Sequence, residues 1–585
     1  MKKSLLTLLL LISLSGCTFQ KVTLTGVSHA DSEDVTYFTS DGNGDSVTAV
    51  TSITEPSNTA EFTMTTTDGT VPTPVNNIYT ITVGGTYVLS GLLNGGIIIN
   101  TSGNVTLELN NVSIVNSSNS PIYAKAANSL KVKALNGTTN LLKDTRANKT
   151  SDDTTGNVGE GALSAKCDLS LVGQGTLLIV GNYNNGVHTT KDLSIKNQKL
   201  QVEAYDDGLK GKDSVSIESG TIKVITKNGD GIATDNSDLS SSLKQRGTIE
   251  ITGGTIDIDS AYDGISAAYN FTLSEDSAST SLTIVSGLFS SNAKSKYTTT
   301  DSHKGIKSEN EMTFKAGDVY IKSSDDAVHA NYGTTLQNGS SGLGNITFAG
   351  GTYSLYAGDD AIHADNTLNI NGGTVKVINA KEGLEANFVN INGGSTKISA
   401  TDDGVNCSKK IGKTPEINVK GGLLDVTVGN GDTDGVDSNG NYYQSGGIVI
   451  TRGPSSSNMN MSAIDADGTA QVTGGTLIAL GALGTTPTLA NTVFKATFGN
   501  ASSNQGGFPG GPGGGRPLLD ASSSLAVGNY LVDLDNNDIE FYLSTTQSAL
   551  TIITNDMTKG NTYKVTKDGS TLYEWTQSSQ TYTQS

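Results

Sequence analysis

Residues 206–224 read DDGLKGKDSVSIESGTIKV, and this stretch contains the pattern that decides the fold. An acidic pair and a glycine precede Leu209, and apolar residues then alternate with polar ones at Val215–Ile217 and at Ile222–Val224. Alternation with a period of two is typical of strands with one buried face, and glycine is typical of the turns between strands. Three short strands and three turns in about 22 residues are the plan of one coil of a parallel β-helix.

The same signal recurs along most of the chain. In each copy a glycine or alanine follows a polar or charged residue and precedes an apolar residue, and these apolar residues are Val187, Leu209, Ile232, Ile265, Ile306, Val328, Ile362, Leu384, Val405 and Val436. The interval is 22 residues from Val187 to Leu209 and 21 from Leu384 to Val405. Longer intervals fit one coil plus an insertion, such as residues 332–343. We therefore predict an all-β solenoid of stacked coils.

Stacking places equivalent residues of successive coils about 4.8 Å apart, so the acidic turns would form a column. Like charges at that distance disfavour the folded chain unless a cation neutralises them. Calcium binds about six to eight oxygen atoms, so we expect calcium in this column. The candidate ligands are Asp206, Asp207, Asp230, Asp263, Asp325, Asp326, Asp359, Asp360, Asp402, Asp403 and Asp434. The alternative is that each aspartate only caps backbone amides of its own turn.

Catalysis of the polysaccharide lyase type needs a strong base beside the substrate, usually an arginine. None of the four arginines follows the acidic turns in the pattern: Arg146, Arg246, Arg452 and Arg516. Lys210 and Lys307 do follow them, and could act as bases only if desolvated. His188, His329 and His363 occupy the same outward column, in which His329 and His363 lie on adjacent coils, about 5 Å apart. This pair fits either a metal-binding site or two solvated histidines on a sheet face.

Composition narrows the class of partner. The formal charge of −19 argues against nucleic acid and favours divalent cations. Cys167 and Cys407 would lie about nine coils apart, so no disulfide between them holds the fold together.

Both ends of the chain differ from the repeat. Residues 1–16 form a predicted signal peptide. Leu14-Ser15-Gly16-Cys17 spans its cleavage point and is a bacterial lipobox, so we expect Cys17 to be acylated. Residues 17–58 are a polar spacer, and the predicted contact with the membrane is the lipid anchor alone, at the cell membrane or cell surface. The β-helix then occupies residues 59–500. Residues 501–517 are a Gly/Pro-rich linker or loop, and 518–585 form a small β module that we expect to cap the helix.

Several stretches resemble one protein family: Gly85-Thr86-Tyr87-Val88-Leu89-Ser90-Gly91, Leu107-Glu108-Leu109-Asn110-Asn111-Val112, residues 186–193 and residues 206–213. They are similar to the bacterial cell-surface carbohydrate-binding β-helix proteins, a calcium-containing, cellulose- and pectin-binding family that is itself pectate-lyase-like. The resemblance implies a right-handed parallel β-helix, calcium in the acidic turns and an acidic plant polysaccharide such as polygalacturonate as ligand. We expect a surface-anchored lipoprotein that binds polysaccharide. A polysaccharide lyase of the pectate-lyase type and a structural adhesin without a glycan ligand are the alternatives.

The lipobox generates the first prediction. Replacing Cys17 by alanine removes the thiol that would be acylated, so the Cys17→Ala protein should be released from the membrane or stall during processing. Fractionation of cells and gel mobility measure this outcome. Retention of Cys17→Ala in the membrane fraction with unchanged mobility would contradict lipidation.

Overall fold

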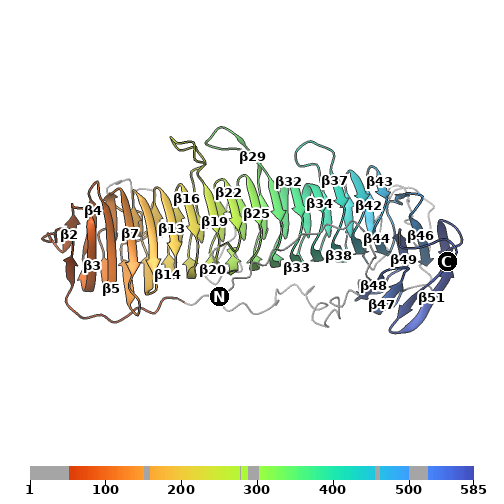
Figure 1. The fold of residues 1–585 in the computed structure, drawn as a ribbon, viewed down its shortest axis with the longest axis horizontal. Helices are drawn as coiled ribbons and strands as arrows, with labels where there is room; N and C mark the ends of the chain where they lie inside the picture. The colour runs from red at the N-terminus through yellow and green to blue at the C-terminus, as the bar shows by residue number, and fades with distance from the viewer. Residues whose placement is uncertain are drawn as a thin grey trace, which may run out of the picture.

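The computed structural model describes residues 52–150, 158–276, 279–287, 302–431, 433–454, 461–499 and 525–584. Across these residues the chain is all β without an α-helix, and most strands join one mostly parallel sheet of 46 strands. The strands stack along one long axis (Figure 1). The prediction of an all-β chain with a solenoid-like parallel sheet is confirmed, whereas its right-handed sense stays a prediction. The signal peptide, Cys17 and the linker at 501–517 lie outside the described residues.

The first stack of strands carries the acidic turns at its N-terminal edge. Its members pair in parallel in the order β2 (Ile78–Ile81), β4 (Gly96–Asn100), β6 (Ile122–Ala126), β9 (Gly161–Ala165), β12 (Asn185–Thr189), β15 (Leu209–Gly211), β18 (Ile232–Ala233), β21 (Ile265–Ala267), β24 (Ile306–Ser308), β27 (Val328–Ala330), β32 (Ile362–Ile370), β34 (Leu384–Ile391), β36 (Val405–Cys407), β39 (Val436–Ser438) and β42 (Ile464–Ala466).

The second stack begins with β1 (Thr63–Thr66), which is antiparallel to β3 (Gly85–Asn94). It continues in parallel through β5 (Asn104–Asn116), β7 (Ser129–Ala134), β10 (Asp168–Gly173), β13 (Asp192–Lys196), β16 (Ser214–Ile217), β19 (Thr248–Ile251), β22 (Asn270–Leu273), β25 (Glu311–Phe314), β30 (Asn345–Phe348), the second halves of β32 and β34, β37 (Glu416–Val419), β40 (Asn441–Gln444), β43 (Ala470–Val472) and β45 (Thr488–Leu489).

The third stack begins in the second halves of β3 and β5. It continues through β8 (Thr139–Asp144), β11 (Thr176–Gly181), β14 (Gln198–Ala204), β17 (Gly220–Thr226), β20 (Gly254–Ser260), β23 (Thr280–Ser286), β26 (Asp318–Ser323), β31 (Thr352–Ala357), β33 (Thr374–Ala380), β35 (Ser395–Ala400), β38 (Leu423–Val428), β41 (Ile448–Arg452) and β44 (Thr476–Leu480). One insertion forms its own hairpin, β28 (Tyr332–Thr335) with β29 (Ser341–Leu343).

The apolar residues that follow each turn are register partners in the first stack. Val187 pairs with Leu209 and Leu209 with Ile232, and the same column continues to Ile464. All of these side chains are buried, because successive residues of a strand point to opposite faces and this set points inward.

Glycine in the acidic turns is required by close packing. A Cβ atom on Gly208 would lie 2.2 Å from Val224 Cγ1, and one on Gly264 would lie 2.3 Å from Ile284 Cγ2. At the opposite corner the requirement is different, since Gly373 and Gly394 have φ angles of 82° and 75°. Such positive φ angles are readily adopted by glycine alone.

The C-terminal segment packs on the last coils. Strand β49 (Ala549–Thr554) is antiparallel to β44 and to β46 (Phe494–Gly499), and β52 (Thr581–Gln584) pairs in parallel with β46. A separate antiparallel sheet contains β48 (Asp538–Leu543), β47 (Gly528–Asp533), β50 (Thr562–Lys567) and β51 (Ser570–Thr576). Trp575 is buried in this segment, so its ring is not a surface platform for sugars.

Aromatic rings stack inside the solenoid and generate a prediction about stability. Phe314 is fully buried, its ring lies parallel to that of Phe348 at 4.6 Å between centroids, and Phe271 lies 5.5 Å away on the other side. Phe314→Ala should lower the free energy of unfolding by about 3–5 kcal/mol, because it leaves a cavity in the core. Thr313→Ala, on the outward face of the same strand, is the matched control. Equal unfolding midpoints for the two variants in denaturant would contradict this packing.

Candidate functional site

A file of mostly polar side chains follows the first stack on its outer face. Each member directly follows the buried apolar residue of its coil and pairs in register with the next: Ser164, His188, Lys210, Ala233, Ser266, Lys307, His329, His363, Glu385, Asn406, Asp437 and Asp465. We call this set the outward file. The sequence analysis placed the lysines and histidines in it, but missed Glu385, Asp437 and Asp465. Glu385 and Asp437 lie three residues after a turn acid, which was the signal that could have found them, whereas Asp465 lies three residues after Ser462 and lacks this signal.

Several turn acids cap the next coil rather than their own turn. The Asp230 amide donates to Asp207 Oδ1 and the Asp263 amide to Asp230 Oδ1, each at 3.0 Å. Asp326 Oδ1 accepts from the Asp360 amide at 3.0 Å. The capping alternative therefore holds for Asp325, whose Oδ1 accepts from the Asp326 amide of the same turn at 3.0 Å. Asp207, Asp230 and Asp326 instead cap the next coil, because parallel stacking brings its amide within hydrogen-bonding distance. Each of these bonds uses one carboxylate oxygen and leaves the second oxygen for other partners.

Lysines neutralise much of the acidic column. Lys210 Nζ lies 2.8 Å from Asp207 Oδ2, and Lys304 Nζ lies 2.7 Å from Asp325 Oδ2 and 3.1 Å from Asp326 Oδ2. Although burial lowers the pKa of both lysines, the adjacent carboxylates raise it above its usual value. Burial also lowers the pKa of Lys307, but the adjacent carboxylates, Glu309 above all, raise it above its usual value. These ammonium groups keep their protons at neutral pH, which argues against Lys210 or Lys307 as the base of a lyase.

The arginines are held in other ion pairs. Arg146 pairs with Asp144, Arg246 with Asp213 and Arg452 with Asp425. Arg516 lies outside the described residues.

The structure brings some of the predicted calcium ligands together. Oxygens of Asp325, Asp326 and Asp359 lie within 4.8 Å of one another, as do those of Asp434, Asp437 and Asp465. Asp360 instead joins His363 and Glu385. Among the described residues, no such group contains the remaining candidates, which are Asp206, Asp207, Asp230, Asp263, Asp402 and Asp403.

The group of Asp434, Asp437 and Asp465 fits calcium better than the first group. Burial and the charges of Asp434, Asp465 and Asp467 raise the pKa of Asp437 to about 7, so a cation at this point would relieve repulsion. Three carboxylates are hard oxygen donors of the kind that calcium prefers. In the group of Asp325 and Asp326, by contrast, the Lys304 ammonium already lies between the carboxylates.

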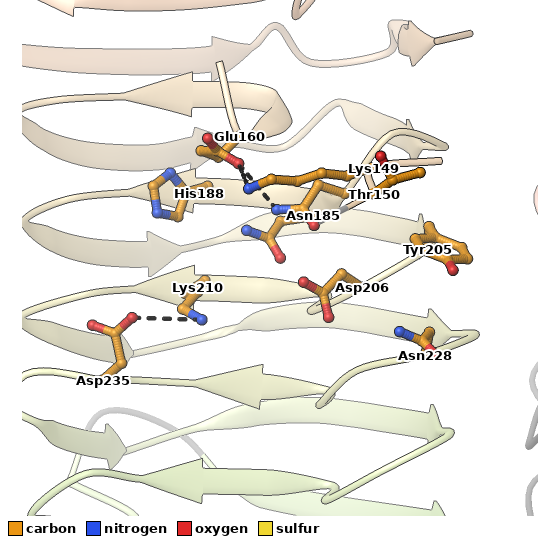
Figure 2. A pocket seen from close by; sticks show the side chains of 11 residues that line it. Lys149, Thr150, Glu160, Asn185, His188, Tyr205, Asp206, Lys210, Asn228 and Asp235 are labelled. Atoms are coloured by element: carbon orange, nitrogen blue, oxygen red, sulfur yellow. Dashed lines mark hydrogen bonds and ion pairs between the residues drawn. The ribbon is translucent and has the colours of Figure 1, made fainter. Parts of the chain in front are cut away.

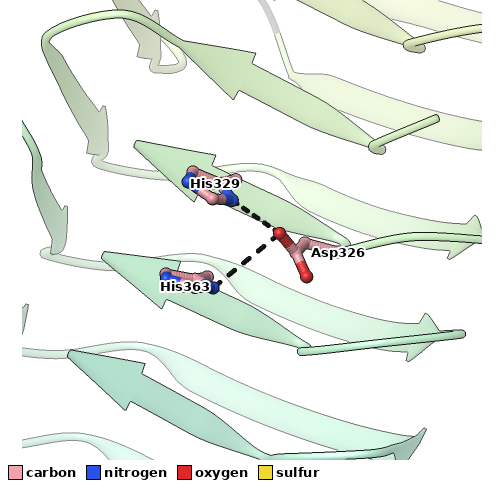
Figure 3. Close-up of side chains that lie close together, drawn as sticks. All are labelled: Asp326, His329 and His363. Atoms are coloured by element: carbon pink, nitrogen blue, oxygen red, sulfur yellow. Dashed lines mark hydrogen bonds and ion pairs between the residues drawn. The ribbon is translucent and has the colours of Figure 1, made fainter. Parts of the chain in front are cut away.

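His329 and His363 form a stacked pair (Figure 3), with ring centroids 4.3 Å apart and an angle of 19° between the rings. Their side chains are 12% and 13% exposed, so they are not two solvated histidines. Asp326 Oδ2 lies 2.5 Å from His329 Nδ1, and Asp360 Oδ2 lies 2.9 Å from His363 Nδ1. Burial lowers the pKa of His363, but the hydrogen bond to Asp360 and the nearby carboxylate of Asp365 raise it to about 10.

An open pocket of about 490 Å³ lies beside the outward file at the level of β12 and β15 (Figure 2). Its lining is polar and comes from successive coils: Lys149, Thr150, Glu160, Asn184, Asn185, His188, Tyr205, Asp206, Lys210, Asn228 and Asp235. The sequence analysis singled out Asp206, His188 and Lys210 among them. It missed most of the others because they lie in turns and loops without a repeated pattern, and it missed Asn185 because that residue is a neutral copy of the acidic turn.

Two polar atoms of the pocket residues lack a protein partner. His188 Nδ1 and Asn228 Oδ1 are buried and make no hydrogen bond within the described part of the chain. Burial, followed by the charge of Lys210, lowers the pKa of His188 to about 4, so the imidazole is neutral at pH 7. Burial and Asp207 raise the pKa of Asp206 to about 6. The pocket therefore offers neutral and charged groups that can bind hydroxyls or a carboxylate.

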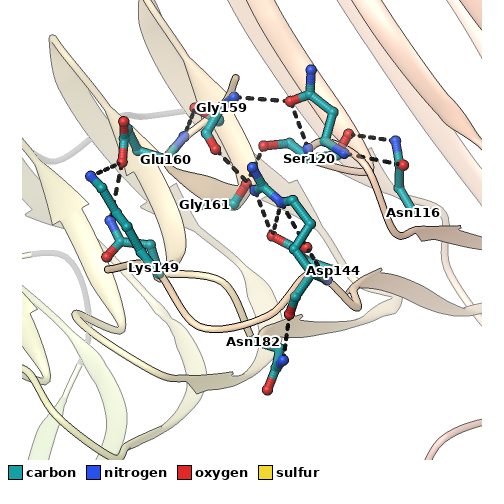
Figure 4. A network of polar contacts seen from close by, with 12 residues as sticks. Asn116, Ser120, Asp144, Lys149, Gly159, Glu160, Gly161 and Asn182 are labelled. Carbon is teal, nitrogen blue, oxygen red and sulfur yellow. Dashed lines mark hydrogen bonds and ion pairs between the residues drawn. The ribbon is translucent and has the colours of Figure 1, made fainter. Parts of the chain in front are cut away.

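A buried ion pair holds one wall of the pocket (Figure 4). Arg146 Nη2 donates to Asp144 Oδ2 at 2.6 Å and to the Gly159 carbonyl at 2.9 Å, and Asn182 donates to the Arg146 carbonyl at 2.5 Å. The bond to Gly159 fixes the chain just before Glu160, whose Oε2 lies 2.5 Å from Lys149 Nζ. These contacts position Lys149 and Glu160 at the mouth of the pocket.

No described segment forms a helix that is both long and apolar enough to cross a membrane.

Comparison with known proteins yields three likenesses. A family model described as carbohydrate-binding domain-containing protein matches residues 75–345 and 341–482. A carbohydrate-binding domain-containing protein of Acetivibrio thermocellus is 32% identical over 127 residues, which are 21% of this chain and 44% of that protein, so less than half of the relative is spanned. A solved structure, described as the polysaccharide lyase-like protein from C. thermocellum in a gadolinium derivative, is 30% identical over 36% of this chain and 83% of its own, with a TM-score of 0.33.

The neutral state of His188 can be tested by titration. NMR of histidine-labelled protein should give a pKa near 4 for His188, and His188→Gln assigns the signal among five histidines. Because the folded pKa lies below the ordinary 6.5, this residue stabilises the folded chain above pH 6.5, and that stability is lost as the pH falls toward 4. His188→Gln should remove this part of the acid sensitivity. A midpoint near 6.5 would show that His188 is solvated.

Proposed function

Because this chain belongs to the family of carbohydrate-binding domain-containing proteins, we propose that it is a surface-anchored lipoprotein that binds an acidic polysaccharide along the outward file. The polysaccharide would enter the pocket of His188 and Asn228 at one end and contact a calcium ion at Asp434, Asp437 and Asp465 at the other. Cys17 would hold the protein at the membrane.

The pocket carries this proposal. Sugar hydroxyls both donate and accept hydrogen bonds, and two residues that line the pocket carry a buried atom without a partner among the described residues: His188 Nδ1 and Asn228 Oδ1. A bound hydroxyl would donate to each of them and remove the cost of a buried unpaired polar atom, which is about 1–3 kcal/mol. The same pocket contains the ammonium groups of Lys149 and Lys210, which pair with Glu160 and with Asp207 and Asp235 and could also contact a ligand carboxylate. A uronic acid supplies both the hydroxyls and the carboxylate that this lining matches.

Bound calcium would reduce the electrostatic repulsion between this negatively charged protein and a negatively charged polysaccharide. The chain has a formal charge of −19, which opposes the approach of polygalacturonate. A calcium ion on the three carboxylates of Asp434, Asp437 and Asp465 would leave coordination positions for water or for a carboxylate of the ligand. The ion would also relieve the repulsion that raises the pKa of Asp437.

The calcium proposal predicts that chelation has two linked effects. Excess EDTA should lower the melting temperature and weaken binding to polygalacturonate, because calcium binds the folded chain only and bridges to the ligand. At a calcium concentration of about a hundred times its Kd, the stabilisation would be about 2.7 kcal/mol. The double variant Asp437→Asn with Asp465→Asn should lose most of the response to EDTA in both measurements.

Matched variants separate the pocket from the calcium site. Glu250→Gln with Asp318→Asn removes two exposed acids on other faces of the solenoid and should keep the full response to EDTA. His188→Ala with Asn228→Ala should weaken polygalacturonate binding and leave the effect of EDTA on the melting temperature unchanged. Absence of binding to any glycan would contradict the proposed function and favour an adhesin. Release of unsaturated product would favour a lyase.

A further inference from the structure

We infer that Asp326, His329, Asp360, His363 and Glu385 form a binding site for one divalent transition-metal ion of the zinc class. The site lies in the middle of the outward file, on strands β27, β32 and β34 and on the turns before them. It is distinct from the proposed calcium site in its donors, and it does not depend on the binding of a polysaccharide.

The ligand atoms lie at distances that suit one small cation. Nitrogen or oxygen atoms of Asp326, His329 and His363 lie within 4.8 Å of one another, and so do those of Asp360, His363 and Glu385. His363 Nδ1 is 2.9 Å from Asp360 Oδ2, 3.1 Å from Glu385 Oε2 and 3.9 Å from Asp326 Oδ2. Ligands of a tetrahedral zinc ion are separated by about 3.3 Å. A single ion beside His363 Nδ1 could therefore be coordinated by residues of both groups.

The carboxylates in this cluster lack enough donors. Asp360 is 5% exposed, and its Oδ1 is buried without a hydrogen-bond partner in the described chain. Glu385 is 7% exposed, and one of its oxygens pairs with Lys410 Nζ at 2.6 Å. Both side chains are acceptors when ionised, so neither can satisfy the other. A cation that bound both oxygens of the Asp360 carboxylate would give Oδ1 the partner that it lacks.

Asp365 supplies an outer contact of the kind that orients a metal-binding histidine. Its Oδ1 lies 3.2 Å from His363 Nε2 and 3.9 Å from His329 Nε2. When Nδ1 of an imidazole binds a metal, a carboxylate at Nε2 fixes the tautomer and the ring orientation. Asp365 is therefore a positioning residue for both rings, while the Nδ1 atoms face the acidic turns.

The donor types decide between zinc and calcium. Calcium selects oxygen ligands, whereas imidazole nitrogen combined with carboxylate suits zinc and other late first-row metals. Register explains why both nitrogen atoms are available here: His329 pairs with His363, and each lies three residues after its own turn acid. Elsewhere in the file this position is a serine, an alanine, a lysine, an asparagine or a carboxylate, or it is His188, whose turn has no acid three residues before the ring.

The full chain, purified in detergent and freed of metal with EDTA, tests this inference. Equilibrium dialysis with Zn²⁺ should give one tightly bound ion per chain that excess Ca²⁺ does not displace. His363→Ala should weaken zinc binding by at least about tenfold, and His329→Ala should weaken it as well. His188→Ala, a histidine of the same file without the acidic cluster, should bind zinc as the parent does.

X-ray absorption of the zinc-loaded parent keeps the inference testable even if a variant does not fold. Imidazole nitrogen together with carboxylate oxygen in the zinc shell would support the site. A shell of oxygen alone, binding that survives His363→Ala, or an equal loss in His188→Ala would each overturn it. Circular dichroism of every variant confirms that a loss of binding is not a loss of fold.

Discussion

The parallel register between successive coils is the constraint on which the rest of this molecule depends. Each strand donates and accepts backbone hydrogen bonds only across the stack, so a coil cannot shift without losing its bonds to both neighbours. Register also brings like residues together. Phe314 contacts Phe348, and the Asn390 amide donates to Asn369 and accepts from Asn418. Stacking of like residues is favourable for rings and amides, and it is unfavourable for charges unless they find partners.

The repulsion between stacked like charges is relieved by different partners at different points along the solenoid axis. In most turns, the aspartate that directly precedes the glycine or alanine uses one carboxylate oxygen to accept a hydrogen bond from a backbone amide of the next coil. The remaining charge is met by lysines near Asp207 and Asp326 and by histidines near Asp326 and Asp360. Near Asp437 the neighbours that shift its pKa most are other carboxylates. The three parts of the outward file thus offer an ammonium, an imidazole and a purely acidic environment at nearly constant spacing.

A linear array of this kind suits an extended ligand. A polysaccharide presents the same groups at regular intervals, and the outward file presents one side chain per coil in a straight line on the face of a stack. In the proposed function, the pocket beside His188 would supply specific contacts, and bound cations would supply attraction for a polyanion that the net charge of −19 otherwise repels. The buried pair of Arg146 and Asp144 keeps one wall of the pocket fixed, so that binding would cost little ordering of the chain.

The sequence by itself determined the all-β class, the repeated strands and the identity of the inward apolar column, because alternation and turn glycines are local properties of each coil. Val187, Leu209 and Ile232 align in the sequence and pair in the structure. Only the tertiary structure decided which partner each acid takes. Asp230 accepts a hydrogen bond from the amide of Asp263 and is repelled by the charge of Asp207. Asp360 lies beside His363 and Glu385. All of these partners except His363 belong to other coils, and the number of residues between coils varies with each insertion. Packing between coils sets the direction of these side chains and the position of the loops that form the pocket. Neither could be predicted from a local sequence pattern.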